Sequence, residues 1–293
     1  MKGFKRMLLA AAFVVAAAFT SITQAAEIKL AVTDLEGLEQ VQREFGAFKD
    51  VLQKETGFDI TFYPVSNRTA AVEALSAKKI DFVLTGPAEY VVFKKRSDAA
   101  PIVGFSRPDY FAGIIVLADS PYMRVKDLKG QKVAFGDVGS TSNHLAPMQA
   151  LADLGIDPRV DIEALHVDRK VAWEGLKRGD VAAIGINYGK FLELRDKEAD
   201  LPPGAFRVIA RSPDLPNDML LAGSHVSAET VETVRKAFVD ASDALVAAIL
   251  TGEDNQKYKG MKFLAGIEDK DYDYVRSMYA TIGYPQYAEF VGD

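Results

Sequence analysis

The hydrophobic and polar positions of this chain follow an alternation of strand-like and helix-like segments. Short apolar runs are typical of buried strands, and segments whose apolar residues recur every three or four positions are typical of amphipathic helices. The first strands are predicted at residues 28–32, 58–65 and 80–84, and the first helices at 38–56, 69–77 and 88–95. This β-α-β-α-β order predicts a parallel sheet with helices on both faces.

The same alternation begins again after Ser120-Pro121. Strands are predicted at residues 132–135, 162–166 and 181–186, and helices at 145–154 and 171–176. Further strands at 114–117, 206–210 and 220–222 and a long helix at 227–250 precede a helical, aromatic-rich tail. Two copies of one pattern predict an α/β protein with two similar lobes, joined near 112–118 and 212–220. Lobe 1 is expected at 26–114 and 219–293, and lobe 2 at 115–218.

The first 25 residues have the pattern of a cleavable signal peptide. Lys2, Lys5 and Arg6 precede an apolar run from Met7 to Phe19, and small residues end the segment at Ala25. The apolar run is too short to span a membrane as a helix. No cysteine follows it, so a lipoprotein is not expected. The interpretation is a protein free in the periplasm of a Gram-negative cell.

Composition excludes several classes of function. The 293 residues include no cysteine, which rules out disulfides, thiolate metal sites and cysteine catalysis. A net charge of −6 argues against nucleic acid, but not against an anion held by local donors. The 3 histidines lack metal-ligand spacing. We expect no metal and no cofactor, and a monomer.

A glycine-flanked turn followed by three hydroxyl residues is the main candidate for chemistry. Ser140, Thr141 and Ser142 follow a predicted strand and begin a predicted helix. Unpaired N–H groups and the helix dipole make such a turn suited to a small oxyanion, although an ordinary N-cap has the same residues. His144 lies on the same helix face as Ser140, where it could belong to the site or to the packing. Without an orienting acid, this pair is weak evidence for a nucleophile.

Other polar residues follow the predicted strands, where ligands bind in open parallel sheets. These candidates are Arg68, Arg169, Asn187, Tyr188 and Asp218. An arginine at the start of a helix faces the positive end of the dipole, and a bound anion would offset this and accept its hydrogen bonds. The alternatives are solvated surface arginines and, for Asp218, a turn residue.

The chain resembles the periplasmic solute-binding proteins of phosphonate, phosphite and phosphate ABC transporters. The resemblance rests on Ile80-Asp81-Phe82-Val83 before Gly86-Pro87-Ala88-Glu89-Tyr90, on Val133-Ala134-Phe135 before Gly139-Ser140-Thr141-Ser142, and on Leu215-Pro216-Asn217-Asp218. It implies a two-lobed periplasmic-binding fold of type II connectivity with the ligand in the cleft between the lobes. The hydroxyls and amides of Ser140, Thr141 and Ser142 would then hold a phosphoryl-like group.

The resemblance also implies roles for other residues and shows departures from the family pattern. Tyr110 stands for the tyrosine before the crossing strand, and Asp218 for the acceptor aspartate. Arg68 replaces an expected tyrosine and Arg169 an expected histidine. Gly189 replaces the glutamate of aminoalkylphosphonate binders. Fewer acids and more guanidinium groups favour a more anionic ligand, because an unpaired buried cation is costly.

The leading hypothesis is therefore a non-catalytic receptor that captures phosphate, phosphite or a non-amino phosphonate and delivers it to a membrane ABC permease. The aspartate at 218 would favour a ligand that carries a proton over fully ionised sulfate. One alternative is a periplasmic oxyanion sensor that partners a membrane histidine kinase. Another is a periplasmic hydrolase that uses Ser140.

Overall fold

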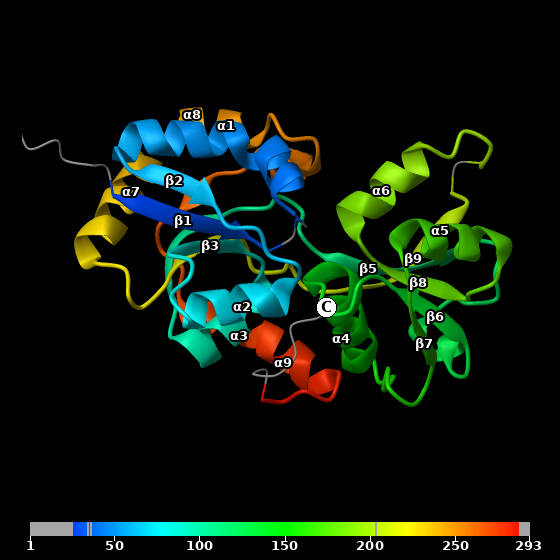
Figure 1. Ribbon diagram of the computed structural model, residues 1–293. Coiled ribbons are helices and arrows are strands. Elements are labelled where there is room, and N and C mark those ends of the chain that lie inside the picture. Colours follow the sequence, from blue (N-terminus) through cyan, green and yellow to red (C-terminus); the bar gives the residue numbers. More distant parts are fainter. Residues whose placement is uncertain (1–25, 34, 36, 203, 287–293) are drawn as a thin grey trace, which may run out of the picture.

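The computed structural model describes residues 26–33, 35, 37–202 and 204–286, which form two α/β lobes lying side by side (Figure 1). The signal peptide expected at residues 1–25 lies outside this part of the chain. Within it, none of the helices combines the length and the apolar character that crossing a membrane requires.

The sheet of the first lobe has the strand order β11-β4-β10-β3-β1-β2. Its strands are β1 (Glu27–Val32), β2 (Asp59–Phe62), β3 (Phe82–Thr85), β4 (Ala100–Phe105), β10 (Asp218–Ala222) and β11 (Phe263–Leu264). The strand β1 is parallel to both of its neighbours, β2 and β3, whereas β10 is antiparallel to both β3 and β4. The first residue of β10 therefore lies at the edge of the sheet where the parallel strands have their last residues.

The sheet of the second lobe has the order β7-β6-β8-β5-β9. Its strands are β5 (Ala112–Leu117), β6 (Lys132–Phe135), β7 (Glu163–His166), β8 (Ala183–Asn187) and β9 (Phe206–Arg211). Here β5 is the antiparallel strand between two others. In both sheets the inserted strand is the first one after the chain arrives from the other lobe. This repeated arrangement is the type II connectivity that the resemblance implies.

The chain passes between the sheets twice. It leaves β4 at Phe105 and enters β5 at Ala112, and it returns between Arg211 and Asp218. Since β5 pairs with β8 and β9 from its first residues, we propose that the first crossing is residues 106–111. This places the start of lobe 2 a few residues earlier than the sequence suggests. The second crossing is residues 212–217.

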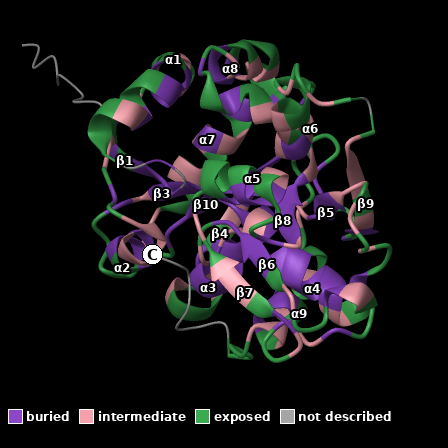
Figure 2. Ribbon diagram, turned by 90° about the vertical axis from the view of Figure 1, so that its right-hand side faces the viewer, coloured by how far each residue is buried: buried purple, intermediate pink, exposed green. Residues whose placement is uncertain are grey.

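Each sheet is covered by helices on both faces (Figures 1 and 2). Successive side chains of a strand point to opposite faces of its sheet. In β1, Leu30 and Val32 pack under α1 (Leu38–Thr56), α7 (Ala228–Asp240) and α8 (Ser242–Ile249). Ala31 faces the opposite layer, α2 (Arg68–Ser76), α3 (Pro87–Ser97) and α9 (Asp273–Thr281). In lobe 2, α4 (Ala146–Asp153) covers one face, and α5 (Arg169–Arg178) and α6 (Tyr188–Asp196) cover the other.

Short helices complete the chain: η1 (Val125–Leu128), the π-helical η2 (Thr141–Leu145), η3 (Asp254–Tyr258) and η4 (Asp269–Tyr272). The long helix predicted at 227–250 is divided at Ala241, which has φ −115° and ψ 26°. Aspartate and serine flank this break, and their side chains compete for backbone hydrogen bonds within a helix. The predicted alternation otherwise matches the observed elements, except that β4, α6 and β11 were not predicted.

The core of the first lobe is built around Phe105, which is fully buried and meets the rings of Phe48, Phe238, Tyr258 and Phe263 edge-on or tilted. We expect Phe105→Ala to lower the free energy of unfolding by about 3–5 kcal/mol, because it removes buried area and leaves a cavity. Urea denaturation followed by circular dichroism measures this change. The control is Val239→Ala, since Val239 is 68% exposed. Equal losses for both variants would contradict the assigned core.

Candidate functional site

A cleft of ≈ 550 Å³ lies between the lobes and is lined by residues of both. The parallel strands of both sheets end toward it, and the helices that follow them begin there. Because β5 and β10 are antiparallel, their first residues lie at this same edge. The structure thus brings nine of the ten predicted site residues to the cleft: Arg68, Tyr110, Ser140, Thr141, Ser142, Arg169, Asn187, Tyr188 and Asp218.

The turn from β6 into η2 is held by its own side chains. The Ser140 hydroxyl accepts hydrogen bonds from the backbone N–H and the side-chain amide of Asn143, at 3.4 and 3.2 Å. The Asn143 side-chain oxygen accepts from the backbone N–H of Asn187 at 2.9 Å. Ser140 is therefore an N-cap, and Asn143 joins the turn to the start of α6.

The next two hydroxyl residues differ in their contacts. The Thr141 hydroxyl accepts from the Ala88 N–H at 3.0 Å, which links lobe 2 to the first turn of α3 in lobe 1. Ser142 is only 5% exposed, and its hydroxyl makes no hydrogen bond to a residue that the structure describes. The backbone N–H groups of both residues begin a helix and have no acceptor among the described residues. Three donors, the two N–H groups and the Ser142 hydroxyl, are thus left for a ligand.

His144 is the one predicted site residue that is not among those lining the cleft. Its Nδ1 accepts from the Gly139 N–H at 2.9 Å, and its ring meets His166 edge-on at 4.5 Å between centroids. Burial, followed by the effect of His166, lowers the pKa of His144 to about 3. The neutral imidazole therefore holds the turn at Gly139, whose φ of +87° favours glycine.

Arg68 lies at the start of α2 and pairs with Glu89. Glu89 is 2% exposed and lies in the first turn of α3. A buried carboxylate requires such a partner, because desolvation of an unpaired charge is costly. The expected arginine is thus present at the cleft with its charge compensated from within the lobe.

Arg107 was not predicted as a site residue, and it contacts two residues that were predicted, Tyr110 and Asp218. Its Nη1 lies 3.4 Å from both carboxylate oxygens of Asp218, and its guanidinium stacks 3.6 Å from the ring centroid of Tyr110. Asp218 is 2% exposed and also accepts from the Tyr258 hydroxyl at 2.6 Å. The available signal was a cation three residues before Tyr110, in the segment that crosses between the lobes.

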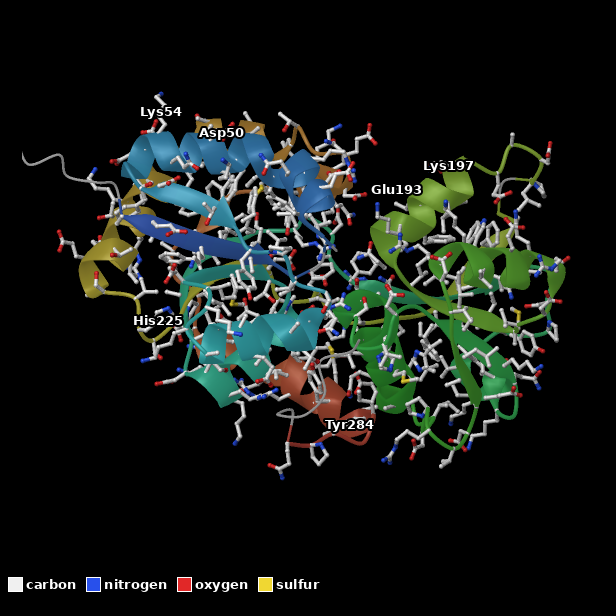
Figure 3. All side chains as sticks on the ribbon, viewed as in Figure 1. Asp50, Lys54, Glu193, Lys197, His225 and Tyr284 are labelled. Carbon is white, nitrogen blue, oxygen red and sulfur yellow. The ribbon has the colours of Figure 1, made fainter. Side chains whose placement is uncertain are left out.

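Lobe 2 contributes further groups to the cleft. Arg169 is exposed at the start of α5 and forms no ion pair with the described residues. Asn187 caps α6, and the Tyr188 ring stacks on Phe111 with centroids 4.5 Å apart. Figure 3 shows Glu193 on the side of α6 that faces lobe 1.

The charges around the cleft are balanced. The lining contains as many carboxylates as cationic side chains, so local donors must decide what binds. Among the described residues, no group of three or more histidine, aspartate and glutamate side chains is arranged to hold a metal ion.

Two α/β lobes of type II connectivity with polar helix starts around the cleft between them define a substrate-binding protein. The chain belongs to the family described as "ABC transporter, phosphonate, periplasmic substrate-binding protein", whose sequence pattern matches residues 30–271.

Individual relatives agree with this assignment. The chain is 26% identical over 238 residues to the Phosphate-import protein PhnD of Mycolicibacterium smegmatis, covering 75% of this chain and 72% of the relative. PhnD1 from Prochlorococcus marinus, solved with methylphosphonate, has a TM-score of 0.68 at 16% identity and covers 88% of this chain and 98% of its own. A Xanthomonas citri protein bound to ATP has a TM-score of 0.70 at 16% identity, covering 89% and 98%. These two structures are similar in fold.

The protein is therefore a periplasmic substrate-binding protein of an ABC phosphonate or phosphate transporter, and not an enzyme. This function implies a small ligand, a membrane permease as partner and an extracytoplasmic location. The comparisons point to transport and do not support the histidine-kinase alternative.

The buried His144 predicts a specific dependence of stability on pH. Below about pH 6.5 the unfolded chain binds a proton at this imidazole, whereas the folded protein binds it only near pH 3. Stability is therefore lost as the pH falls, by about 1.4 kcal/mol per pH unit between these values. We expect His144→Asn, which keeps an acceptor for Gly139, to remove this contribution.

The measurement is urea denaturation of both proteins at pH 7 and pH 5. The wild type is expected to lose about 2 kcal/mol more than the variant over this interval. Parallel losses in the two proteins would show that His144 is not buried in its neutral form.

Proposed function

We propose that the cleft binds a phosphorus oxyanion, namely phosphate, phosphite or a phosphonate without an amino group. The observation that carries the proposal is the start of η2, where the Ser142 hydroxyl and the N–H groups of Thr141 and Ser142 are left without partners among the described residues. A tetrahedral oxyanion presents several acceptor oxygens to such a cluster, and the dipole of the helix that continues into α4 favours negative charge.

The buried acids of the cleft support a ligand without an ammonium group. Glu89 and Asp218 are both buried, and each is paired with an arginine. An ammonium group would have to compete with a guanidinium for either carboxylate. Gly189 offers no side chain at the position where the family resemblance implies a glutamate.

Asp218 supports a preference among tetrahedral anions. Its carboxylate accepts hydrogen bonds from Arg107 and Tyr258, and a carboxylate has lone pairs for a further donor. A protonated phosphorus oxyanion supplies that donor, whereas fully ionised sulfate places an oxygen against an oxygen. We therefore propose that phosphorus oxyanions bind more tightly than sulfate.

The first test is a calorimetric titration with phosphate, phosphite, methylphosphonate, 2-aminoethylphosphonate and sulfate. We expect Ser142→Ala to weaken binding of the tightest ligand by about 10- to 100-fold, the value of a hydrogen bond to a charged group. The matched control is Ser277→Ala on the exposed side of α9, where the hydroxyl bonds only within its helix. Equal binding by all variants, or sulfate binding as tightly as phosphate, would contradict the proposal.

The two predicted arginines need different tests because their surroundings differ. Arg169 is exposed, so Arg169→Gln is expected to weaken binding about tenfold while leaving stability unchanged. Its control is Arg178→Gln at the opposite end of α5, where the arginine pairs with Asp180. If both variants bind as tightly as the wild type, Arg169 is a solvated surface residue that does not contact the ligand.

Removal of Arg68 alone takes away the ion-pair partner of the buried Glu89, and breaking a buried pair costs about 3–5 kcal/mol of stability. The informative protein is the double variant Arg68→Met with Glu89→Gln, which removes both charges together. We expect it to fold like the wild type in urea denaturation and to bind the oxyanion more weakly. Unchanged affinity would mean that Arg68 serves only Glu89.

A further inference from the structure

The lobe 1 side of the cleft holds two arginine–carboxylate pairs next to each other. Arg68 pairs with Glu89, and Arg107 pairs with Asp218. Both acids lie against Gly86: a Cβ atom at that position would be 2.9 Å from Glu89 Oε2 and 3.8 Å from Asp218 Oδ1. The two buried carboxylates therefore lie close together, and each forms an ion pair with an arginine.

Among the residues that the structure describes, one cation, Arg107, lies within hydrogen-bond distance of Asp218. Arg107 comes from the first crossing, and the Tyr258 hydroxyl donates from η3. Tyr272 of η4 lies near enough that the negative charge of Asp218 adds to the effect of burial in raising its pKa. On the remaining side, beyond Gly86, is the compensated pair of Glu89 and Arg68. Tyrosine hydroxyls carry no charge at neutral pH, so the compensation of Asp218 falls to Arg107.

The position of Arg107 is fixed from three directions. Its backbone N–H donates to the Asn217 side-chain oxygen at 3.0 Å, its guanidinium stacks on Tyr110, and its Nη1 meets Asp218. The side chain is 12% exposed and lines the cleft. It therefore lies beside a buried negative charge, and both groups line the space that the proposed anion would occupy.

We propose that Arg107 is a specificity-determining residue that sets which ionisation state of the ligand the cleft accepts. By compensating the charge of Asp218, it allows a doubly ionised oxyanion that still carries one proton, namely hydrogen phosphate, to bind without taking up a second proton. Without that compensation, two negative groups would meet in a partly desolvated cleft, and binding would require a further proton on one of them. This inference rests on the proposed function, because it concerns the ligand of the same cleft.

The test compares Arg107→Gln, which removes the charge, with Arg107→Lys, which keeps it. Phosphate binding is measured by calorimetry between pH 7 and pH 9, in pairs of buffers with different ionisation enthalpies, which reports the protons taken up on binding. For the wild type and Arg107→Lys we expect little proton uptake at the alkaline end and an affinity that barely changes with pH. For Arg107→Gln we expect uptake of about one proton and an affinity that falls up to tenfold per pH unit.

A second variant separates charge from packing. Arg107→Gln combined with Asp218→Asn removes both charges, and it is expected to lose the extra proton uptake and the steep pH dependence. Urea denaturation of each variant confirms that it is folded. If Arg107→Gln binds more weakly with the same proton uptake as the wild type, Arg107 acts only through packing and the inference is wrong. If the wild type binds none of the phosphorus oxyanions, the proposed function itself fails.

Discussion

The structure depends on the pairing of its two crossing segments with each other. Ser212, the first residue of the second crossing, exchanges two hydrogen bonds with Ala112, where the first crossing enters β5, at 2.9 Å between backbone atoms and 3.0 Å from the Ala112 N–H to the Ser212 hydroxyl. Leu215 donates to the Tyr110 carbonyl at 2.8 Å, and Asn217 accepts from Arg107. Because each segment then enters the middle of a sheet as an antiparallel strand, both new strands must begin at the cleft. The two segments that connect the lobes therefore also form part of the cleft.

The two sides of the cleft contribute different chemistry. The lobe 2 side offers neutral donors at the start of η2 and the exposed Arg169. The lobe 1 side offers Arg68 and Arg107, each held by a buried carboxylate. Neutral donors can surround the oxygens of an anion, whereas the paired charges on the opposite side would, by our proposal, impose conditions on its ionisation. This arrangement contributes to the balanced charge of the lining, because Arg68 and Arg107 are each accompanied by the acid that holds them.

Much of the fold follows from patterns in the sequence, and its exceptions have physical causes. The alternation of strands and helices can be read from neighbouring residues, and it occurs twice along the chain, so the sequence predicts two lobes. It misses β4, where Pro101 and Gly104 interrupt the strand signal; a register shift in the pairing with β10 accommodates the proline. It misses α6 because Gly189 lies in its first turn. The strand ends locate Ser142 and Asp218 at the site, but the partners of Arg68 and Arg107 come from other elements and depend on tertiary contacts that no local spacing encodes.

Closure of two lobes over a ligand requires contacts that exist only in the closed arrangement. The start of η2 presents its donors from lobe 2 alone, so its hydrogen bonds to an anion do not depend on the position of lobe 1. If the cleft binds an anion as proposed, contacts of that anion with lobe 1 groups such as Arg68 and Arg107 would favour closure. A shift of an equilibrium from 1:99 to 99:1 needs about 5.5 kcal/mol, and hydrogen bonds to charged groups contribute about 1.5–3 kcal/mol each. Two arginines held in place by Glu89 and Asp218 would contribute about 3–6 kcal/mol on this scale, which reaches the required shift only at its upper end, and their fixed geometry lowers the ordering cost that closure must overcome.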